Sequence, residues 1–270
     1  MADDRGTTAG ARSRAGKILA PLAALAAFFA LWQAATALLH VNPAILPAPT
    51  SIFANIVHQR ALLAQYMEPT LVEILLGFGL AIAIGVPIGT LIVFSPAAHR
   101  AFYPLIVASQ MVPKVAIAPL FVVWVGVGLP SKVLVAFLIS FFPIVVSTGQ
   151  GLAAVDPDMI KLFKSMGASP MRTFVKLRLP VALPSVFSGL KVAMSLAVVG
   201  AIVGEFVAAN TGLGYYLLFA NGQLDTVGVY SALFVLTLLG VVLYFAVEVV
   251  ERAVVPASFR KSEEELSVTL

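Results

Sequence analysis

The polar side chains that could bind a ligand inside this chain stand within long apolar runs. Lys114 lies between Pro113 and Pro119, and Gln110 precedes it by about one helical turn. Glu205 stands near the end of another apolar run. An ionisable group within an apolar segment is costly, so it is a functional hypothesis by default. These residues offer hydrogen bonds and, at Lys114, a countercharge for a bound anion.

Each charge in these runs also has a structural interpretation. Lys114 could extend toward an interface or pair with the carboxyl end of a helix. Lys191 and Glu205 return to nearly one helix face, but they are 14 residues and about 21 Å apart, which excludes a direct pair. We expect Lys191 in the inner half of its helix and Glu205 at the outer end. Glu73 is either an interfacial charge or part of an outer gate.

The motifs that indicate common enzymes are missing. No stretch matches the nucleotide-binding pattern GxxxxGK[ST], the zinc-protease pattern HExxH or the serine elbow GxSxG. The chain has no cysteine, which excludes disulfides and thiolate metal sites. The histidines, His40, His58 and His99, lie at run ends or in loops. We therefore expect no catalytic residue, metal or bound cofactor, and an intramembrane enzyme is the weaker hypothesis.

The elements that must position these residues are long apolar helices. The chain is 60% hydrophobic and 11% charged, with a mean hydropathy of +1.00, which leaves too little polar surface to wrap a soluble core. A bilayer core about 30 Å thick needs roughly 20 apolar residues in a helix. The six runs of this kind are residues 18–39, 70–94, 101–127, 133–149, 181–206 and 229–250. The fold class is therefore an all-α, polytopic membrane protein. Its third run should kink or break at its prolines.

The distribution of basic residues predicts the topology. With the N-terminus inside, thirteen lysines and arginines flank the runs on the inner side, against Arg60 and Lys132 on the outer side. Both termini are thus predicted to be cytoplasmic. Residues 1–17 and 258–270 read as disordered tails, and 18–257 as one membrane domain. The outer segment 40–67 can hold an interfacial helix. A net charge of +4 is too small and dispersed for a nucleic-acid partner.

The longest inner segment, residues 151–180, predicts two short helices joined by a glycine. Asp156 can cap the first helix, with Pro157 in its first turn. Gly167 can end that helix in a left-handed conformation, and Ser169 with Pro170 can start the second. One face is apolar, formed by Met159, Ile160, Phe163, Met166, Phe174 and Leu177. This surface suits docking of a soluble partner, although a basic inner loop also follows from the positive-inside rule alone.

The same loop resembles the EAA loop of binding-protein-dependent ABC importer permeases. Gly167 is followed after nine residues by the sequence LRLP, which ends at Pro180. The family usually has glutamate and two alanines shortly before the glycine, whereas Lys161, Leu162 and Phe163 stand here. Lys161 cannot form a salt bridge that the family's glutamate forms at this position, whereas the glycine elbow and the closing Leu-x-Pro are present.

Further stretches resemble the nitrate, sulfonate and taurine type of permease. They are residues 112–128, 141–145, 183–191 and 204–214. The likeness covers roughly residues 71–251, most of the chain. It implies the MetI-like fold of type I ABC importers, with six transmembrane helices and transport by alternating access in the bacterial inner membrane.

The resemblance also implies partners and site residues. The partners are a dimer of ATP-binding cassette ATPases, an extracytoplasmic substrate-binding protein and a second permease copy, with ATP used by the ATPase alone. The implied coupling residues are Asp156, Lys161, Phe163, Met166, Gly167, Ala168, Pro170, Phe174, Leu177 and Pro180. The candidate translocation-path residues are Gln110, Pro113, Lys114, Pro119 and Glu205.

The substrate implied by this branch is a sulfonate, taurine, nitrate or similar small anion. A heterocycle such as a pyrimidine precursor or riboflavin is the alternative. A secondary transporter is the rival class, and it would need buried ion-coupling carboxylates. The carboxylates of the runs, Glu73, Glu205 and Glu248, instead cluster near the run ends, which disfavours that class.

Overall fold

The structure is a computed structural model that describes residues 7–256, with side chains described from Leu19 onward except those of Tyr103, Val107 and Ser109. The tail predicted over 258–270 and the first six residues of the tail predicted over 1–17 therefore lie outside the described residues. Residues 7–17, predicted as part of the first tail, are helical and begin α1.

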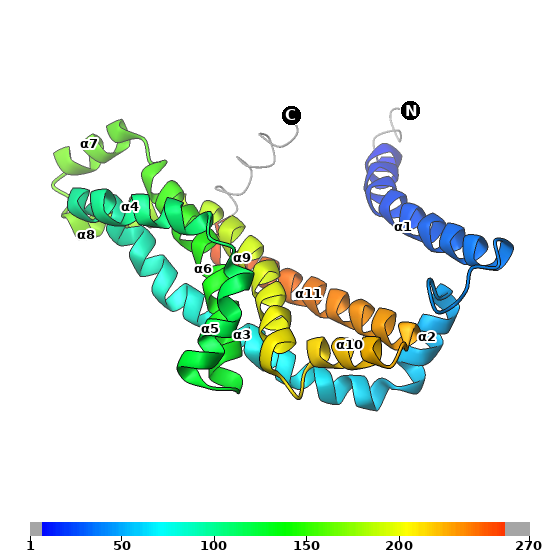
Figure 1. The fold of residues 1–270 in the computed structure, drawn as a ribbon. Helices are drawn as coiled ribbons and strands as arrows, with labels where there is room; N and C mark the ends of the chain where they lie inside the picture. Colours follow the sequence, from blue (N-terminus) through cyan, green and yellow to red (C-terminus); the bar gives the residue numbers. More distant parts are fainter. Residues whose placement is uncertain (1–6, 257–270) are drawn as a thin grey trace, which may run out of the picture.

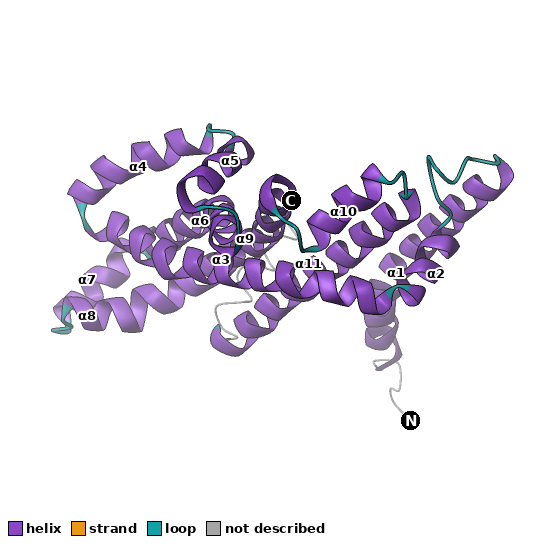
Figure 2. Cartoon of the chain, turned by 60° about the horizontal axis from the view of Figure 1, so that its bottom comes forward, coloured by secondary structure: helices purple, strands orange, loops and turns teal. Residues whose placement is uncertain are grey.

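All regular structure within residues 7–256 is helical (Figures 1 and 2). The elements are α1 (Thr7–Leu38), α2 (Pro49–His58), α3 (Arg60–Phe94), α4 (Pro96–Gln110), α5 (Lys114–Val125), α6 (Leu129–Ala153), α7 (Pro157–Ser165), α8 (Pro170–Thr173), the π-helical turn η1 (Phe174–Arg178), α9 (Leu179–Ala208), α10 (Leu213–Gly222) and α11 (Thr226–Val254). The predicted interfacial helix of the outer segment corresponds to α2.

Within residues 7–256, five stretches are long and apolar enough to cross a membrane: Leu19–Leu38, Arg60–Phe94, Leu129–Ala153, Pro170–Ala208 and Thr226–Val254. They match five of the six predicted runs. The remaining run, 101–127, is divided between α4 and α5. The division falls just before Lys114, where Pro113 lacks the amide donor that a continuous helix needs. The predicted break is thus present.

The second short helix of the inner loop is not a separate element, which corrects the prediction. α8 continues through η1 into α9, so one helical path runs from Pro170 to Ala208. Pro180 has no N–H to donate to the carbonyl of Lys176, and a wider π-helical turn before it accommodates the missing bond. The short helix α10, after a turn at Gly212, was not predicted.

α9 lies at the centre of the bundle and packs against α6, α3 and α11 (Figure 1). Small residues permit this approach. A Cβ added at Gly200 would lie 2.6 Å from the Cα of Ala136, and one added at Gly89 would lie 2.7 Å from the carbonyl oxygen of Val145. These two glycines therefore serve packing within the subunit.

α1 stands apart from the central helices and contacts α2 and α11 (Figure 1). An aromatic cluster makes the connection. The ring of Phe234 in α11 lies 5.8 Å from Phe29 and 5.4 Å from Phe53, and Trp32 lies 5.9 Å from Tyr230. The first helix is thus attached at one end by ring contacts, outside the main core.

Candidate translocation and coupling sites

A buried group of polar side chains joins α3, α6 and α9 near α10. Glu73 in α3 has no exposed surface, and Lys132, in the first turn of α6, is 6% exposed. Lys132 Nζ forms an ion pair with Glu73 Oε1. Gly204 lets α6 approach, because a Cβ there would lie 3.0 Å from the Cα of Lys132. A buried pair of this kind is sensitive to the loss of either partner.

Glu205 completes this group from the end of α9 and is 1% exposed. The Thr70 hydroxyl donates to Glu205 Oε1 at 2.5 Å, and the Gly214 amide donates to Oε2 at 2.5 Å. The Leu213 amide donates to the Thr70 hydroxyl oxygen at 2.8 Å. Gly212 has φ +108°, and any Cβ there would collide with the Glu205 carboxylate. The turn before α10 therefore wraps directly onto this carboxylate.

We call Thr70, Glu73, Lys132 and Glu205 the charge cluster. The carboxyl groups of Glu73 and Glu205 lie close enough for their charges to interact. Sequence reasoning placed Lys132 among the basic residues flanking the runs on the outer side; the structure buries it instead. Glu205 was predicted to line the path, but in this conformation its carboxylate contacts groups of the fold.

The other predicted path residues lie around the break between α4 and α5. Gln110 ends α4 and is exposed, as are Pro113 and Pro119. Lys114 begins α5, and its Nζ lies 4.7 Å from the centroid of the Phe142 ring in α6, at a cation–π distance. The structure thus separates Glu205 from the other four residues, which share one region.

A cavity of about 730 Å³ lies between α3, α4 and α6, and Gln110 at the end of α4 is among its lining residues. It is lined by Ile92, Val93, Pro96, His99, Arg100, Ile106, Gln110, Val145, Val146, Gly149, Gln150 and Ala153. These residues come from the end of α3, from α4 and from the end of α6. The cavity is therefore near the start of the loop that holds α7, at the end of the bundle opposite the charge cluster.

Lys191 has a structural role, as the sequence favoured. Its Nζ pairs with Glu251 Oε2 in α11 at 2.9 Å. Glu251 is 7% exposed, so the pair ties α9 to α11 in the half of the bundle away from Glu205. Sequence spacing excluded Glu205 as a partner but could not identify Glu251.

The inner loop folds around the predicted caps. Asp156 precedes α7, and its carboxylate accepts the Asp158 amide at 2.8 Å. Gly167 ends the helix with φ +74°. Ser169 then precedes Pro170 at the start of α8, and its hydroxyl accepts the Arg172 amide at 3.3 Å. Figure 1 shows α7 and α8 projecting together from one end of the bundle.

The exposed part of this loop is α7 and the elbow. Met159 is 43% exposed, Leu162 50% and Met166 74%. Lys161, at the position of the usual glutamate, pairs with Asp158 in its own helix at 2.8 Å, and both side chains are largely exposed. Such a surface pair contributes little to stability, so the charge of Lys161 is available to a partner.

Phe174 and Leu177 face the bundle, which corrects their place on the predicted apolar docking face. Leu177 is 7% exposed. The Phe174 ring lies 5.5 Å from the ring of Phe94 at the end of α3, and the Arg178 guanidinium lies 4.8 Å from the same Phe94 ring. These residues connect the loop to the membrane helices, whereas α7 presents the free surface.

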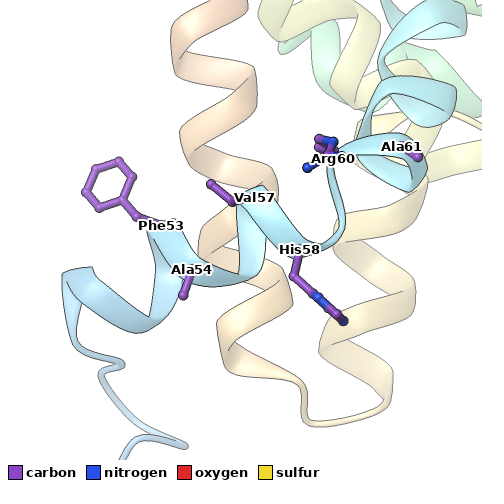
Figure 3. A pocket seen from close by; sticks show the side chains of 6 residues that line it. All are labelled: Phe53, Ala54, Val57, His58, Arg60 and Ala61. Carbon is purple, nitrogen blue, oxygen red and sulfur yellow. The ribbon is translucent and has the colours of Figure 1, made fainter.

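An open hollow lies at the other end of the molecule, where α2 meets α3 (Figure 3). Its lining residues are Phe53, Ala54, Val57, His58, Arg60 and Ala61. Phe53 and Val57 are 47% and 62% exposed. Within the described residues, no group of three or more histidine, aspartate or glutamate side chains could hold a metal ion.

Comparisons with known proteins agree with this architecture. Residues 77–256 match the family described as "Binding-protein-dependent transport system inner membrane component". The formylaminopyrimidine transport permease protein ThiX of Halalkalibacterium halodurans is 39% identical over 80% of this chain and 86% of its own length. The taurine transport system permease protein TauC of Escherichia coli is 28% identical over 86% of this chain and 87% of its own length.

A solved structure shows the same fold. An inward-facing structure of the MetNI methionine ABC transporter contains a chain that superposes with a TM-score of 0.62 at 24% identity, covering 73% of this chain and 98% of that one. The helical bundle, the exposed α7 elbow and the family match lead to one conclusion. The chain belongs to the binding-protein-dependent transport system inner membrane components, as a multi-pass permease subunit of an ABC importer that works with ATPase subunits.

Proposed function

We propose that this permease works as a homodimer that imports a small nitrogen heterocycle, with an ATPase subunit docked on α7 of each copy. The observation that carries the coupling part is the exposed elbow. Met166 is 74% exposed at the end of α7, and Gly167 turns the chain there. Phe174 behind it packs on Phe94, so a push on α7 is transmitted to α3 and α9.

The membrane orientation follows from the basic residues. We place α7, α8 and both termini in the cytoplasm, because the inner side of this topology carries thirteen lysines and arginines. The α2 hollow and α10 then face the outside of a bacterial inner membrane, where a substrate-binding protein docks. Residues 18–257 form the membrane domain. ATP is bound and hydrolysed by the partner ATPase, and this chain binds no cofactor.

The mechanism is alternating access driven by the ATPases. Their closure on ATP moves α7 and the helices to which it is attached, and opens the path to the outside. Hydrolysis returns the subunits to an inward-open arrangement. The break at Pro113 leaves α4 and α5 as separate bodies, which suits a segment that must change its angle while the core around α9 stays packed.

A heterocyclic substrate is favoured by the degree of similarity. The formylaminopyrimidine permease is 39% identical to this chain, against 28% for the taurine permease. A small anion such as taurine, another sulfonate or nitrate is the second candidate. This candidate is favoured by Arg100, which lines the cavity between α3, α4 and α6, here called the inner cavity. The binding protein sets most of the selectivity in such a system, so its ligand decides between them.

Two measurements test this proposal. Thermal-shift screening of the cognate binding protein should give stabilisation by formylaminopyrimidine or riboflavin and none by taurine or nitrate. Uptake into proteoliposomes should require this chain, the binding protein, the ATPase and ATP. Stabilisation by taurine alone would overturn the heterocycle. Uptake that persists without the ATPase would instead indicate a secondary transporter and overturn the role of α7.

A further inference from the structure

The inner cavity has the composition of a small-molecule site. Its volume of about 730 Å³ lies within the range of ligand pockets, which are mostly apolar with a few polar groups. The wall is apolar where α3, α4 and α6 meet, with Ile92 7%, Ile106 8% and Val145 2% exposed. A planar ring could pack against this apolar wall through van der Waals contacts.

Two amide side chains face this wall from different helices. Gln110 ends α4 and Gln150 lies in the last turn of α6, and both line the cavity. Neither side-chain amide has a hydrogen-bond partner among the described residues, and both are exposed. Each amide offers a donor and an acceptor. This pairing matches the ring nitrogens and amino groups of a heterocycle.

The charged group that lines the cavity is the guanidinium of Arg100, which makes one hydrogen bond within its own helix. The Arg100 Nε donates to the carbonyl oxygen of Pro96 in its own helix at 3.3 Å. His99 lies beside it and also has a contact within the fold. The guanidinium keeps its charge and its other N–H donors, so the preference for a ring rests on the two glutamine amides. Each amide offers an acceptor as well as a donor; a heterocycle with ring nitrogens and amino groups uses both, whereas a small anion only accepts.

We propose that this cavity binds the transported solute on the cytoplasmic half of the path, with Gln110 and Gln150 as its specificity-determining residues. The ligand class is a planar, uncharged nitrogen heterocycle held by hydrogen bonds to both amides and by contact with the Ile92 and Val145 wall. This inference rests on the proposed heterocyclic substrate. It adds selection inside the membrane domain to the selection made by the binding protein.

The test uses the full complex of this chain, its ATPase and its binding protein in proteoliposomes, with radiolabelled formylaminopyrimidine. Gln110→Leu and Gln150→Leu keep side-chain volume and remove the amide. Each variant should lower uptake by up to about tenfold, the upper range expected for one hydrogen bond between uncharged groups. Stimulation of ATPase activity by the loaded binding protein should persist, since α7 is unchanged.

A matched control replaces another exposed polar side chain. Thr237 in α11 lines a separate hollow, and its hydroxyl donates only to the Leu233 carbonyl oxygen of its own helix. Thr237→Val should leave uptake unchanged. Equilibrium binding of formylaminopyrimidine to the nucleotide-free complex without binding protein should weaken in the glutamine variants and not in the control.

The outcomes separate this inference from the function on which it rests. Wild-type uptake of formylaminopyrimidine together with wild-type behaviour of both glutamine variants would overturn the cavity and leave the heterocyclic substrate intact. Equal loss in Thr237→Val would also overturn it, because the effect would then be general. Wild-type uptake of taurine alone would remove the substrate proposal and the cavity proposal together.

Discussion

At the end of the bundle where α3 and α6 begin, Glu73 and Lys132 pair out of contact with water, and Thr70 and Glu205 join them with two backbone amides. At the opposite end, α3 and α6 finish around a cavity of about 730 Å³ with unbonded amides. The same two helices share a buried ion pair at one end and border a cavity at the other, and they still pack closely beside that cavity at Gly89. With the orientation proposed above, the end that holds the charge cluster faces outward and the end that borders the cavity faces inward.

The largest effect should come from breaking the ion pair of the charge cluster. Lys132→Met leaves Glu73 and Glu205 buried without their cation, which should cost about 3–5 kcal/mol of folding stability. The thermal midpoint of the detergent-solubilised complex measures it. Lys132→Met combined with Glu73→Gln should recover most of the loss. A single variant as stable as wild type would show that the cluster does not hold this end together.

A smaller effect should follow loss of the hydroxyl that bridges α3, α9 and α10. Thr70→Val removes the donor to Glu205 and the acceptor of the Leu213 amide, at a cost of about 1–3 kcal/mol. Thr90→Val is the matched control, because the Thr90 hydroxyl donates only to Val86 in its own helix. Comparable midpoint losses in both variants would contradict the bridging role of Thr70.

The smallest effect on stability should come from the elbow at the open end. Gly167→Ala places a Cβ at φ +74°, with no neighbour within 4 Å, so the cost is about 1–2 kcal/mol of local backbone strain. The thermal midpoint should fall by a few degrees at most, while ATP-dependent uptake falls several-fold as α7 is misdirected. Gly79→Ala, which also meets no neighbour but lacks a positive φ, serves as the control. Unchanged uptake in Gly167→Ala would weaken the coupling role of the elbow.

The sequence predicted what local chemistry determines. Apolar run length located the crossing helices, and the caps at Asp156 and Ser169 with the turn at Gly167 follow from propensities over a few residues. Pro113 marked the break between α4 and α5. Even the departure at Lys161 was visible without coordinates, because it concerns one position in a motif.

Long-range partners were not predictable from one sequence. Lys132 directly precedes an apolar run, so the basic-residue rule assigned it to the outer flank. In the structure, helix packing brings Glu73 of α3 against it. Glu205 looked like a free intramembrane charge because its donors, Thr70 and Gly214, come from other elements. The inner cavity likewise depends on the angle at which α4 leaves α3, which the sequence does not specify.

The absence of cysteine in this chain permits the most direct test of the comparison between the two ends. Ala153 lines the inner cavity and is exposed, whereas Ala201, one turn before Glu205, is fully buried. Ala153→Cys and Ala201→Cys are placed in the nucleotide-free complex and labelled with a water-soluble thiol reagent. Rapid labelling at 153 with protection at 201 is the predicted result. Labelling at 201 as fast as at 153 would contradict tight packing at the end that holds the charge cluster.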